Sequence, residues 1–213
     1  MKRGAGMKQR TLAVVSAGLS QPSSTRLLAD QLSAAAVAAA AELGVELEIR
    51  VIELRELAHD IADHLLTGFP PAALRQALET VEGADALIAV SPIFNASYSG
   101  LFKSFFDVLE KDALADKPVL IAATAGTARH SLALEHAFRP MFGYLRAATV
   151  TTAVFAASDD WGGDPASPAE GALRARIERA TAELAREIDH REPATVADPF
   201  ALTTSFADLL ANN

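Results

Sequence analysis

Hydroxyl side chains gather where a predicted strand gives way to a predicted helix near the start of the chain. The apolar run at 11–15 predicts a short buried strand, and a helix is predicted from about Arg26 to Leu43. Ser and Thr hydroxyls cap the free N–H groups of a helix N-terminus, where the helix dipole also favours negative charge. Ordinary capping needs one hydroxyl, so a larger group indicates a phosphate held by neutral donors. The candidate residues are Ser16, Ser20, Ser23, Ser24 and Thr25.

A second candidate site lies in the stretch from Ser91 to Lys103. It follows the apolar run 86–90, which predicts a strand buried on both faces, and it precedes a predicted amphipathic helix at 102–109. Open α/β sheets hold ligands in loops of this kind, beyond the carboxyl ends of their strands. Aromatic surface beside amide and hydroxyl groups suits a planar ring that forms hydrogen bonds, although Pro and Gly here could simply end one element and start the next. The candidates are Pro92, Ile93, Phe94, Asn95, Ala96 and Ser97.

A third candidate turn follows the predicted strand at 119–124. Its first residues are small, so the backbone there can approach a flat ligand closely. Arg129 adds a cation suited to an anionic cofactor, and His130 is either a structural hydrogen-bonding group or a general acid. We assign no catalytic residue from the sequence. The candidates in this turn are Ala125, Gly126 and Thr127.

The composition narrows the chemistry that the chain can perform. It has 213 residues, no cysteine and a formal net charge of -8 at pH 7. Without cysteine there is no disulfide, thiolate metal site or cysteine nucleophile, so any redox role belongs to a cofactor. The acidic balance disfavours nucleic acid and anionic membranes as partners, and no apolar run approaches the roughly 20 residues of a membrane span. We expect one main domain in a cytoplasmic protein.

The sequence shows no common nucleotide-binding motif in its first loop and no metal-binding motif at 59–64. The first loop contains neither G-x-x-x-x-G-K-[ST] nor G-x-G-x-x-G, which leaves a P-loop NTPase and a Rossmann dehydrogenase unsupported. His59, Asp60, Asp63 and His64 resemble metal ligands by type, but they lack an open-site spacing such as H-E-x-x-H. Scattered surface polar residues explain them better, and we predict no metal site.

Short apolar runs alternate with helical patterns, which predicts a doubly wound α/β domain with a five-stranded parallel sheet and helices on both faces. The strands are expected at 11–15, 45–54, 86–90, 119–124 and 149–156, and the helices at 26–43, 72–81, 102–109, 132–145 and 170–191. Pro140 is expected to kink or break its helix, and no helix or strand is assigned to the segment 55–68. We divide the chain into an N-terminal extension at 1–10, the domain at 11–191 and a C-terminal tail at 192–213, which we expect to dock on the domain.

Together, these motifs resemble the NAD(P)H-dependent FMN reductases of the flavodoxin-like superfamily, over roughly residues 11 to 190. The resemblance rests on the hydroxyl-rich first loop, on S-P-x-[YF]-N-x-S-x-x-G-x-[LF]-K at Ser91 to Lys103, and on T-A-G-x at Thr124 to Thr127. S-A-G-L-S-Q-P-S-S-T-R and R-H-S-L-A-L-E-H-A are similar to the branch that passes reduced FMN to luciferase-like monooxygenases. The resemblance implies a flavodoxin-like fold, FMN in the three loops, NADPH or NADH as the reductant, and a flavin-dependent monooxygenase as a partner.

Two positions depart from the family pattern. Many relatives have an Arg in the region of Leu19 and Gln21, so phosphate neutralisation would rest more on the helix N-terminus here. Relatives often have Tyr where Phe94 stands, which leaves only stacking or packing as its role. Two other functions stay open on the same fold: a quinone, azo or chromate reductase with bound FMN, and a non-enzymatic electron carrier of the flavodoxin type. A phosphoacceptor receiver is weaker, because no acidic cluster follows the first strand.

Bulky apolar residues line two of the predicted helices beyond what one sheet can cover. Since a sheet covers one stripe of each helix, we expect a second copy to cover the remainder, in a homodimer or homotetramer with the flavin site near the boundary. The alternative is that the tail segment 200–210 covers the same patch. The residues concerned are Phe102, Phe105, Phe106 and Leu109 on one helix, and Phe138, Met141, Phe142 and Leu145 on the other.

Overall fold

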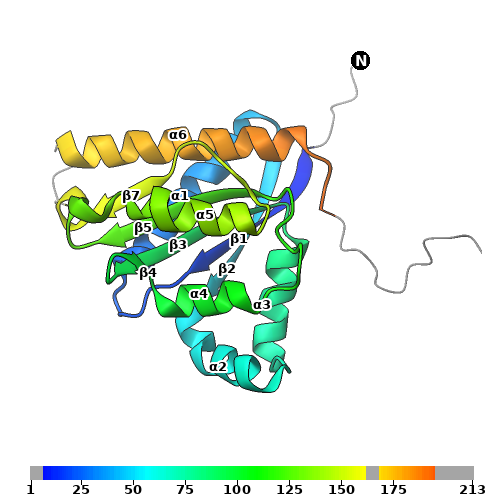
Figure 1. Cartoon of the computed structure of the whole chain (residues 1–213). Coiled ribbons are helices and arrows are strands. Elements are labelled where there is room, and N and C mark those ends of the chain that lie inside the picture. The colour runs from blue at the N-terminus through cyan, green and yellow to red at the C-terminus, as the bar shows by residue number, and fades with distance from the viewer. Residues whose placement is uncertain (1–6, 162–167, 195–213) are drawn as a thin grey trace, which may run out of the picture.

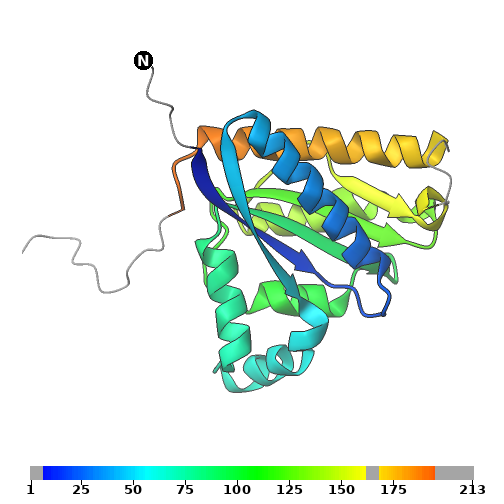
Figure 2. The ribbon, with the colours of Figure 1, turned by 180° about the vertical axis from the view of Figure 1, so that it is seen from behind.

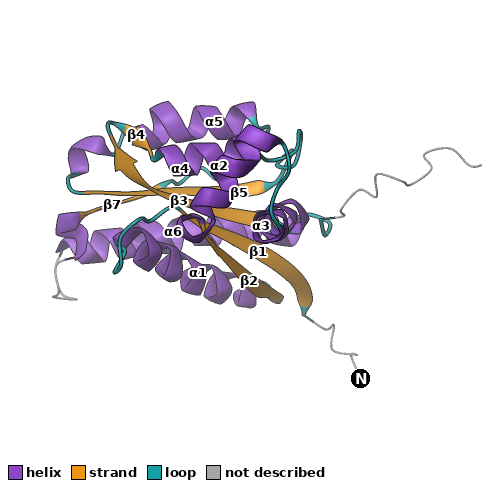
Figure 3. Cartoon of the chain, turned by 90° about the horizontal axis from the view of Figure 1, so that it is seen from below, coloured by secondary structure: helices purple, strands orange, loops and turns teal. Residues whose placement is uncertain are grey.

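A parallel sheet separates two layers of helices in the computed structural model, which describes residues 7–161 and 168–194 (Figure 1). Helices α1 and α6 lie side by side on one face (Figure 2). Helices α2, α4 and α5 lie on the other (Figure 3), and the buried Leu74 and Val81 pack α3 into the same core. The strands are β1 (Lys8–Ser16), β2 (Val45–Glu53), β3 (Ala86–Phe94), β4 (Ser97–Tyr98), β5 (Pro118–Ala125), β6 (Ala148–Thr149) and β7 (Val154–Ala157). The helices are α1 (Ser24–Glu42), α2 (Ala58–Thr67), α3 (Ala72–Gly83), α4 (Gly100–Asp107), α5 (Arg139–Tyr144) and α6 (Pro168–His190).

Four shorter helical segments complete the described part. Three of them are 3₁₀ helices and one, directly before α5, is a π helix that meets α5 where we expected Pro140 to break the helix. Their bounds are Leu54–Leu57, Ala128–His130 and Ser158–Trp161 for the 3₁₀ helices and Leu134–Phe138 for the π helix.

The strand order is β2-β1-β3-β5-β6, with parallel pairing along this whole path. This is the order of flavodoxin-like doubly wound sheets, in which the carboxyl ends of the strands form the ligand edge. The strands have continuous apolar sequences because successive side chains point to opposite faces of the sheet, and a hydrophobic core covers each face. In β1, Leu12 and Val14 pack toward α1 and α6, whereas Ala13 and Val15 face the other helices. The predicted fold class is therefore confirmed.

The count of five strands is wrong, because the sheet has seven. One extra strand is β4, a two-residue partner antiparallel to β3. The other arises because the strand predicted at 149–156 is interrupted: β6 pairs with the start of β5 and β7 with its end. Between them, the Arg139 guanidinium donates to the carbonyls of Val150 and Thr151, at 3.1 Å each, and Glu183 accepts from the Thr152 N–H at 2.7 Å. Side chains thus take the place of sheet hydrogen bonds in the gap.

The two ends of the domain lie close together. β1 begins at Lys8, inside the segment that we assigned to an N-terminal extension, and Lys8 forms an ion pair with Asp189 near the end of α6. The Ala194 N–H donates to an Asp85 carboxylate oxygen at 2.7 Å. The rest of the predicted tail, including 200–210, lies outside the described residues, so its docking stays a prediction. In the described ranges, no helix is long and apolar enough to cross a membrane.

The large aromatic residues of α4 and of the π-α5 segment are buried within one chain. The phenylalanines among the residues that we expected a second copy to cover do not need one, because the rings of the two helices pack on one another, whereas Leu109, Met141 and Leu145 are only partly buried. Phe106 and Phe142 meet edge to face at 5.0 Å between centroids, and Phe102 lies 5.4 Å from Phe138. The fully or almost fully buried members are Phe102, Phe105, Phe106, Phe138 and Phe142.

Lys117 is a buried cation at the amino end of β5, opposite the ligand edge. Its ammonium group donates to the carbonyls of Val81 and Glu82 at 2.5 and 2.8 Å, where α3 ends. Burial lowers the pKa of Lys117 to about 8, with partial compensation from Glu82 and Asp85. The amine therefore satisfies helix-terminal carbonyls that would otherwise lack donors.

This pKa predicts a specific dependence of stability on pH. Between about pH 8 and pH 10.5 the unfolded chain binds more protons at Lys117 than the folded chain, so the free energy of unfolding should rise with pH across this window. The rise should be at most roughly 3 kcal/mol. Urea unfolding followed by circular dichroism at pH 7, 8, 9 and 10 measures it, and Lys117→Met is the control. The same slope in both proteins would contradict this assignment.

Candidate functional site

The first loop ends at a capped helix N-terminus. Ser23 is the N-cap of α1: its hydroxyl accepts from the Arg26 N–H at 3.2 Å, and its carbonyl accepts the first helical bond, from Leu27 N–H at 3.0 Å. The N–H groups of Ser24 and Thr25 precede that bond and have no intrahelical acceptor. No acidic side chain lies in the first turn of α1. The helix end is therefore suited to bind an anion.

Gly18 fits this loop tightly against the cap. A Cβ at this position would lie 2.0 Å from the Ser23 hydroxyl oxygen and about 3.2 Å from the Thr25 Cβ. A side chain here would displace the capping group, so the close approach requires glycine.

The five predicted hydroxyl residues occupy different environments. Ser20 and Ser24 are exposed, whereas Ser23 is half-buried and its hydroxyl is already engaged in the cap. Ser16 and Thr25 are buried, and the Ser16 hydroxyl has no hydrogen-bond partner within the described part of the chain. The hydroxyls available to a ligand are thus those of Ser20 and Ser24, beside the two main-chain N–H groups.

A buried hydrogen bond connects the first loop to the third. The Thr25 and Thr124 hydroxyl oxygens lie 2.8 Å apart, although the residues are 99 positions apart in sequence. Thr124 is the penultimate residue of β5 and lies opposite Pro92 of β3. The N-terminus of α1 therefore crosses above β3 and reaches the end of β5. Sequence reasoning missed Thr124, because no local pattern indicates a partner so far along the chain.

The second candidate stretch is a hairpin, and this corrects our expectation of a plain strand-to-helix loop. Pro92, Ile93 and Phe94 belong to β3, which pairs with β4 through Ile93–Tyr98 and Phe94–Ser97. The turn is Asn95-Ala96, with left-handed φ values of 48° and 69°. Sequence reasoning missed the hairpin because such turns usually carry Asn-Gly.

The hairpin presents an exposed tip above a fixed base. Phe94, Asn95 and Ala96 are exposed, whereas Pro92, Ile93 and Ser97 are half-buried. At the base, the Ser91 hydroxyl accepts from the Ser99 N–H at 3.0 Å and donates to the Pro92 carbonyl at 2.9 Å. The Ser99 hydroxyl in turn caps α4 by accepting from the Phe102 N–H at 3.2 Å. The position of Ser99, just before an apolar helix, is a capping signal that could have identified it from the sequence.

The third turn is short and mostly exposed. Ala125 is the last residue of β5, Gly126 is exposed, and Thr127 is half-buried. The Thr127 hydroxyl accepts from the Arg129 N–H at 3.4 Å and starts the 3₁₀ segment Ala128–His130. These residues follow Thr124 directly, so the hydrogen bond to Thr25 places this turn beside the first loop.

The site is assembled almost entirely from neutral groups. Arg26, the first basic residue of α1, is neutralised by Asp30 and Glu53, and the hydrogen bond to Asp30 is the main cause of its raised pKa. In the described ranges, no three His, Asp or Glu side chains are arranged to hold a metal. The described groove of about 860 Å³ lies between α1 and α6, and the groove of about 490 Å³ lies beside α4 and includes Tyr98 and Lys103 in its lining but none of the candidate residues.

A helix N-terminus with no acid in its first turn, two exposed hydroxyls and an exposed aromatic hairpin fit the phosphate and the ring of a mononucleotide. The fold and these loops define a flavodoxin-like binding domain. The chain has no cysteine, so a cofactor bound by these loops would supply any redox chemistry.

Comparison with known proteins identifies the family. Residues 10–162 match the model of the family described as NADPH-dependent FMN reductase. The chain is 41% identical over 152 residues to an FMN reductase (NADPH) of Pseudomonas aeruginosa, covering 70% of this chain and 78% of that one. It is 40% identical over 168 residues to the NADH-dependent FMN reductase SfnE of Pseudomonas putida, covering 78% and 87%. The chain belongs to the NADPH-dependent FMN reductase family.

Solved structures agree with this assignment. An oxidoreductase from Corynebacterium diphtheriae has a TM-score of 0.82 and 47% identity, covering 86% of this chain and 99% of that chain. An NADH:FMN oxidoreductase in its apo form has a TM-score of 0.70 and 29% identity, covering 81% and 88%. The family, the enzyme class of oxidoreductase and the pairing of FMN with a reduced nicotinamide nucleotide, all predicted from the sequence, are thus confirmed. The individual site residues stay predictions.

The Thr25–Thr124 hydrogen bond gives a testable stability effect. Thr124→Val keeps the shape of the side chain but leaves the Thr25 hydroxyl buried without its partner, which should lower the free energy of unfolding by about 1–3 kcal/mol. Adding Thr25→Val should recover part of this loss, because neither hydroxyl is then left unsatisfied. A double-mutant cycle in urea measures the coupling, and additive losses would show that the two hydroxyls do not depend on each other.

Proposed function

We propose that this protein oxidises NADPH or NADH to reduce FMN and supplies the reduced flavin to a flavin-dependent monooxygenase in the cytoplasm. The observation that carries the proposal is the neutral three-loop site, in which a helix N-terminus with no acid in its first turn stands beside an exposed aromatic hairpin. The names of the relatives support the reaction. One uses NADPH and another NADH, so the choice of nucleotide belongs to the individual protein.

The first loop would hold the FMN phosphate. The N–H groups of Ser24 and Thr25 and the hydroxyls of Ser20 and Ser24 are the donors in reach of the helix end. Ser23 and Gly18 would act indirectly, because the cap and the tight turn position those donors. Bound FMN supplies the two-electron redox chemistry, which no side chain of these loops can provide.

The hairpin and the third turn would hold the ring. Phe94 offers exposed apolar surface for packing, and the Asn95 and Ser97 side chains offer hydrogen bonds at the rim. Ala125, Gly126 and Thr127 present small side chains, so the main chain can lie close to a flat ligand. These residues align and shield the ring, and the loops need no acid or base to do so.

The central test measures nucleotide oxidation with and without FMN. We expect the wild-type protein to oxidise NADPH or NADH above the free-flavin background only when FMN is present. Ser24→Asp places a negative charge beside the phosphate and should weaken FMN binding at least tenfold, about 1.4 kcal/mol. Fluorescence titration of FMN measures the affinity, and anaerobic absorbance at 340 nm measures the turnover.

Ala38→Asp is the matched control for this variant. It adds the same charge to an exposed position of the same helix, about 20 Å from the N-terminus, and should leave FMN binding unchanged. Equal FMN affinity in Ser24→Asp and wild type would refute the phosphate assignment. Tight FMN binding without oxidation of either nucleotide would favour an electron carrier. Faster turnover with a quinone than with FMN would favour a quinone reductase.

We also propose that two or four copies assemble through the surface formed by α4 and α5. Although the phenylalanines are buried, this surface keeps a groove of about 490 Å³ whose walls include Tyr98, Phe106, Met141, Tyr144 and Leu145. Tyr144 is 88% exposed at its rim. Large exposed aromatic side chains beside an apolar groove are typical of an interface, and a symmetric pair is the simplest form.

Tyr144→Arg should disrupt this assembly. A bulky charge at the rim of the apolar groove opposes association, so the variant should scatter light with the mass of one chain at micromolar concentrations at which the wild type is larger. Leu66→Arg is the control, because Leu66 is also highly exposed, at 87%, but lies on α2. Dissociation by Leu66→Arg alone would place the interface at α2, and a wild type with the mass of one chain would refute the assembly.

A further inference from the structure

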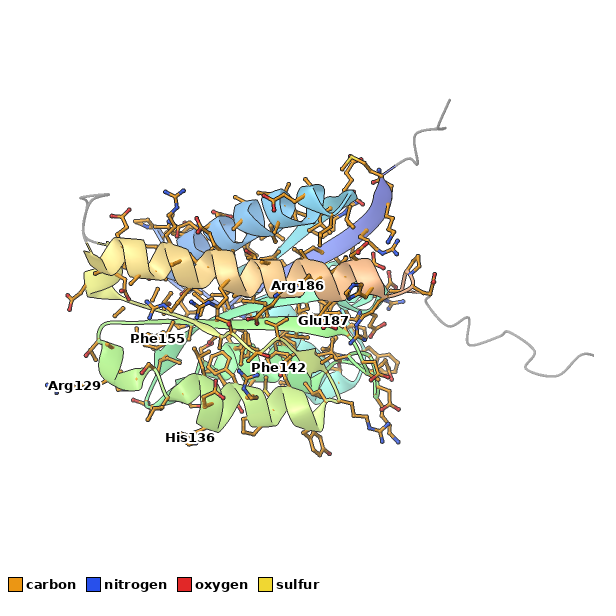
Figure 4. All side chains as sticks on the ribbon, turned by 90° about the horizontal axis from the view of Figure 1, so that it is seen from above. Arg129, His136, Phe142, Phe155, Arg186 and Glu187 are labelled. Atoms are coloured by element: carbon orange, nitrogen blue, oxygen red, sulfur yellow. The ribbon has the colours of Figure 1, made fainter. Side chains whose placement is uncertain are left out.

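The segments 16–25, 91–102 and 124–131, which contain the candidate residues of the three loops, include a single residue with a permanent positive charge. Residues 16–25 and 91–102 have no Lys or Arg, and the turn at 124–131 has only Arg129. Its side chain is exposed, and no hydrogen bond or ion pair connects its guanidinium to any residue of the described ranges. Figure 4 shows Arg129 pointing outward from the turn after β5. The cation is therefore available to a ligand at the rim of the site.

The basic side chains nearest to these segments in the sequence form ion pairs with acidic residues. Arg26 at the start of α1 is paired with Asp30 and Glu53, and Lys103 in α4 is paired with Asp107. Arg55 also lacks a partner in the described part of the chain, but it follows β2, which is separated from β5 by β1 and β3. Within a protein whose formal net charge is -8, Arg129 is the one Lys or Arg of the described third loop that an anion bound there could pair with.

The local backbone fixes the position from which the Arg129 side chain extends. Arg129 is the middle residue of the 3₁₀ segment Ala128–His130, and its N–H is held by the Thr127 hydroxyl at 3.4 Å. The segment starts three residues after Ala125, the end of β5. A ligand whose ring stacks over the proposed ring site could extend past this turn. Its polar groups would then lie toward the Arg129 guanidinium.

We propose that Arg129 binds a phosphate group of the nicotinamide dinucleotide. This inference rests on the proposed function. It assigns neutral donors to the FMN phosphate and a cation to a phosphate of the dinucleotide. FMN brings one phosphate, for which the N-terminus of α1 offers neutral donors, whereas the dinucleotide brings a pyrophosphate and, in NADPH, a 2′-phosphate as well. A guanidinium matches phosphate oxygens with two parallel hydrogen bonds and keeps its charge at every working pH.

Arg129→Gln and Arg186→Gln form the matched pair for the test. Arg186 is likewise exposed and without a partner among the described residues, but it lies on α6, far from the turn (Figure 4). With saturating FMN, Arg129→Gln should raise the KM for NADPH at least tenfold and leave kcat within about twofold, because binding is lost equally in the ground and transition states. Arg129→Lys should recover part of the loss, and Arg186→Gln should match wild type.

Comparing nucleotides identifies the phosphate. A loss confined to NADPH assigns Arg129 to the 2′-phosphate, and an equal loss with NADPH and NADH assigns it to the pyrophosphate. Raising the ionic strength should increase the wild-type KM more than that of Arg129→Gln, since screening weakens only the charged contact.

Other outcomes overturn the inference. Unchanged KM values for both nucleotides in Arg129→Gln would refute it while leaving the proposed function intact. A weaker FMN affinity by fluorescence titration, with both KM values unchanged, would assign Arg129 to the flavin instead. A wild-type protein that oxidises neither nucleotide in the presence of FMN would overturn the proposed function, and this inference with it.

Discussion

The candidate site depends on one buried contact between two threonine hydroxyls. Thr25 is the second residue of α1, and Thr124 is the residue before the last of β5. Their hydroxyl oxygens lie 2.8 Å apart above β3. Hydroxyls buried this deeply each need a partner, so the pair fixes how far α1 advances over the sheet. Together with the packing of α1 in the core that it shares with β3 and β5, this contact sets the distance between the helix end suited to a phosphate and the turn suited to a ring. The site is therefore a product of the tertiary fold and not of any single loop.

A series of serine and threonine caps extends the same principle to the other loops. Ser23 caps α1, Ser99 caps α4, and Thr127 caps the short helix that carries Arg129. Each cap satisfies main-chain N–H groups and sets the angle at which the chain enters its helix. Because these caps are uncharged, they organise the loops without creating a field that would compete with an anionic ligand.

Much of the fold could be predicted from the sequence because its signals are local. Continuous apolar runs mark strands buried on both faces, and Gly44 stands at φ 74° directly after α1, as expected for a residue that ends a helix. The features that escaped prediction depend on distant partners. The interruption of the last strand requires Arg139 and Glu183, and the burial of Phe102 requires rings from a helix some forty residues later. Likewise the motifs located the loops, but only the structure separates the exposed Ser24 from the buried Ser16.

The Asn95-Ala96 turn has a consequence for how the hairpin balances rigidity against stability. An L-residue other than asparagine or aspartate is disfavoured in the left-handed region by roughly 1 kcal/mol, and Ala96 is held there at φ 69°. Glycine would relieve the strain, but it would also enlarge the set of conformations open to the turn in the unfolded chain and around the native one. Alanine keeps the tip small while narrowing those alternatives. The backbone conformation of Ala96 thus costs the hairpin some stability, but it restricts the turn to fewer conformations before a ligand binds.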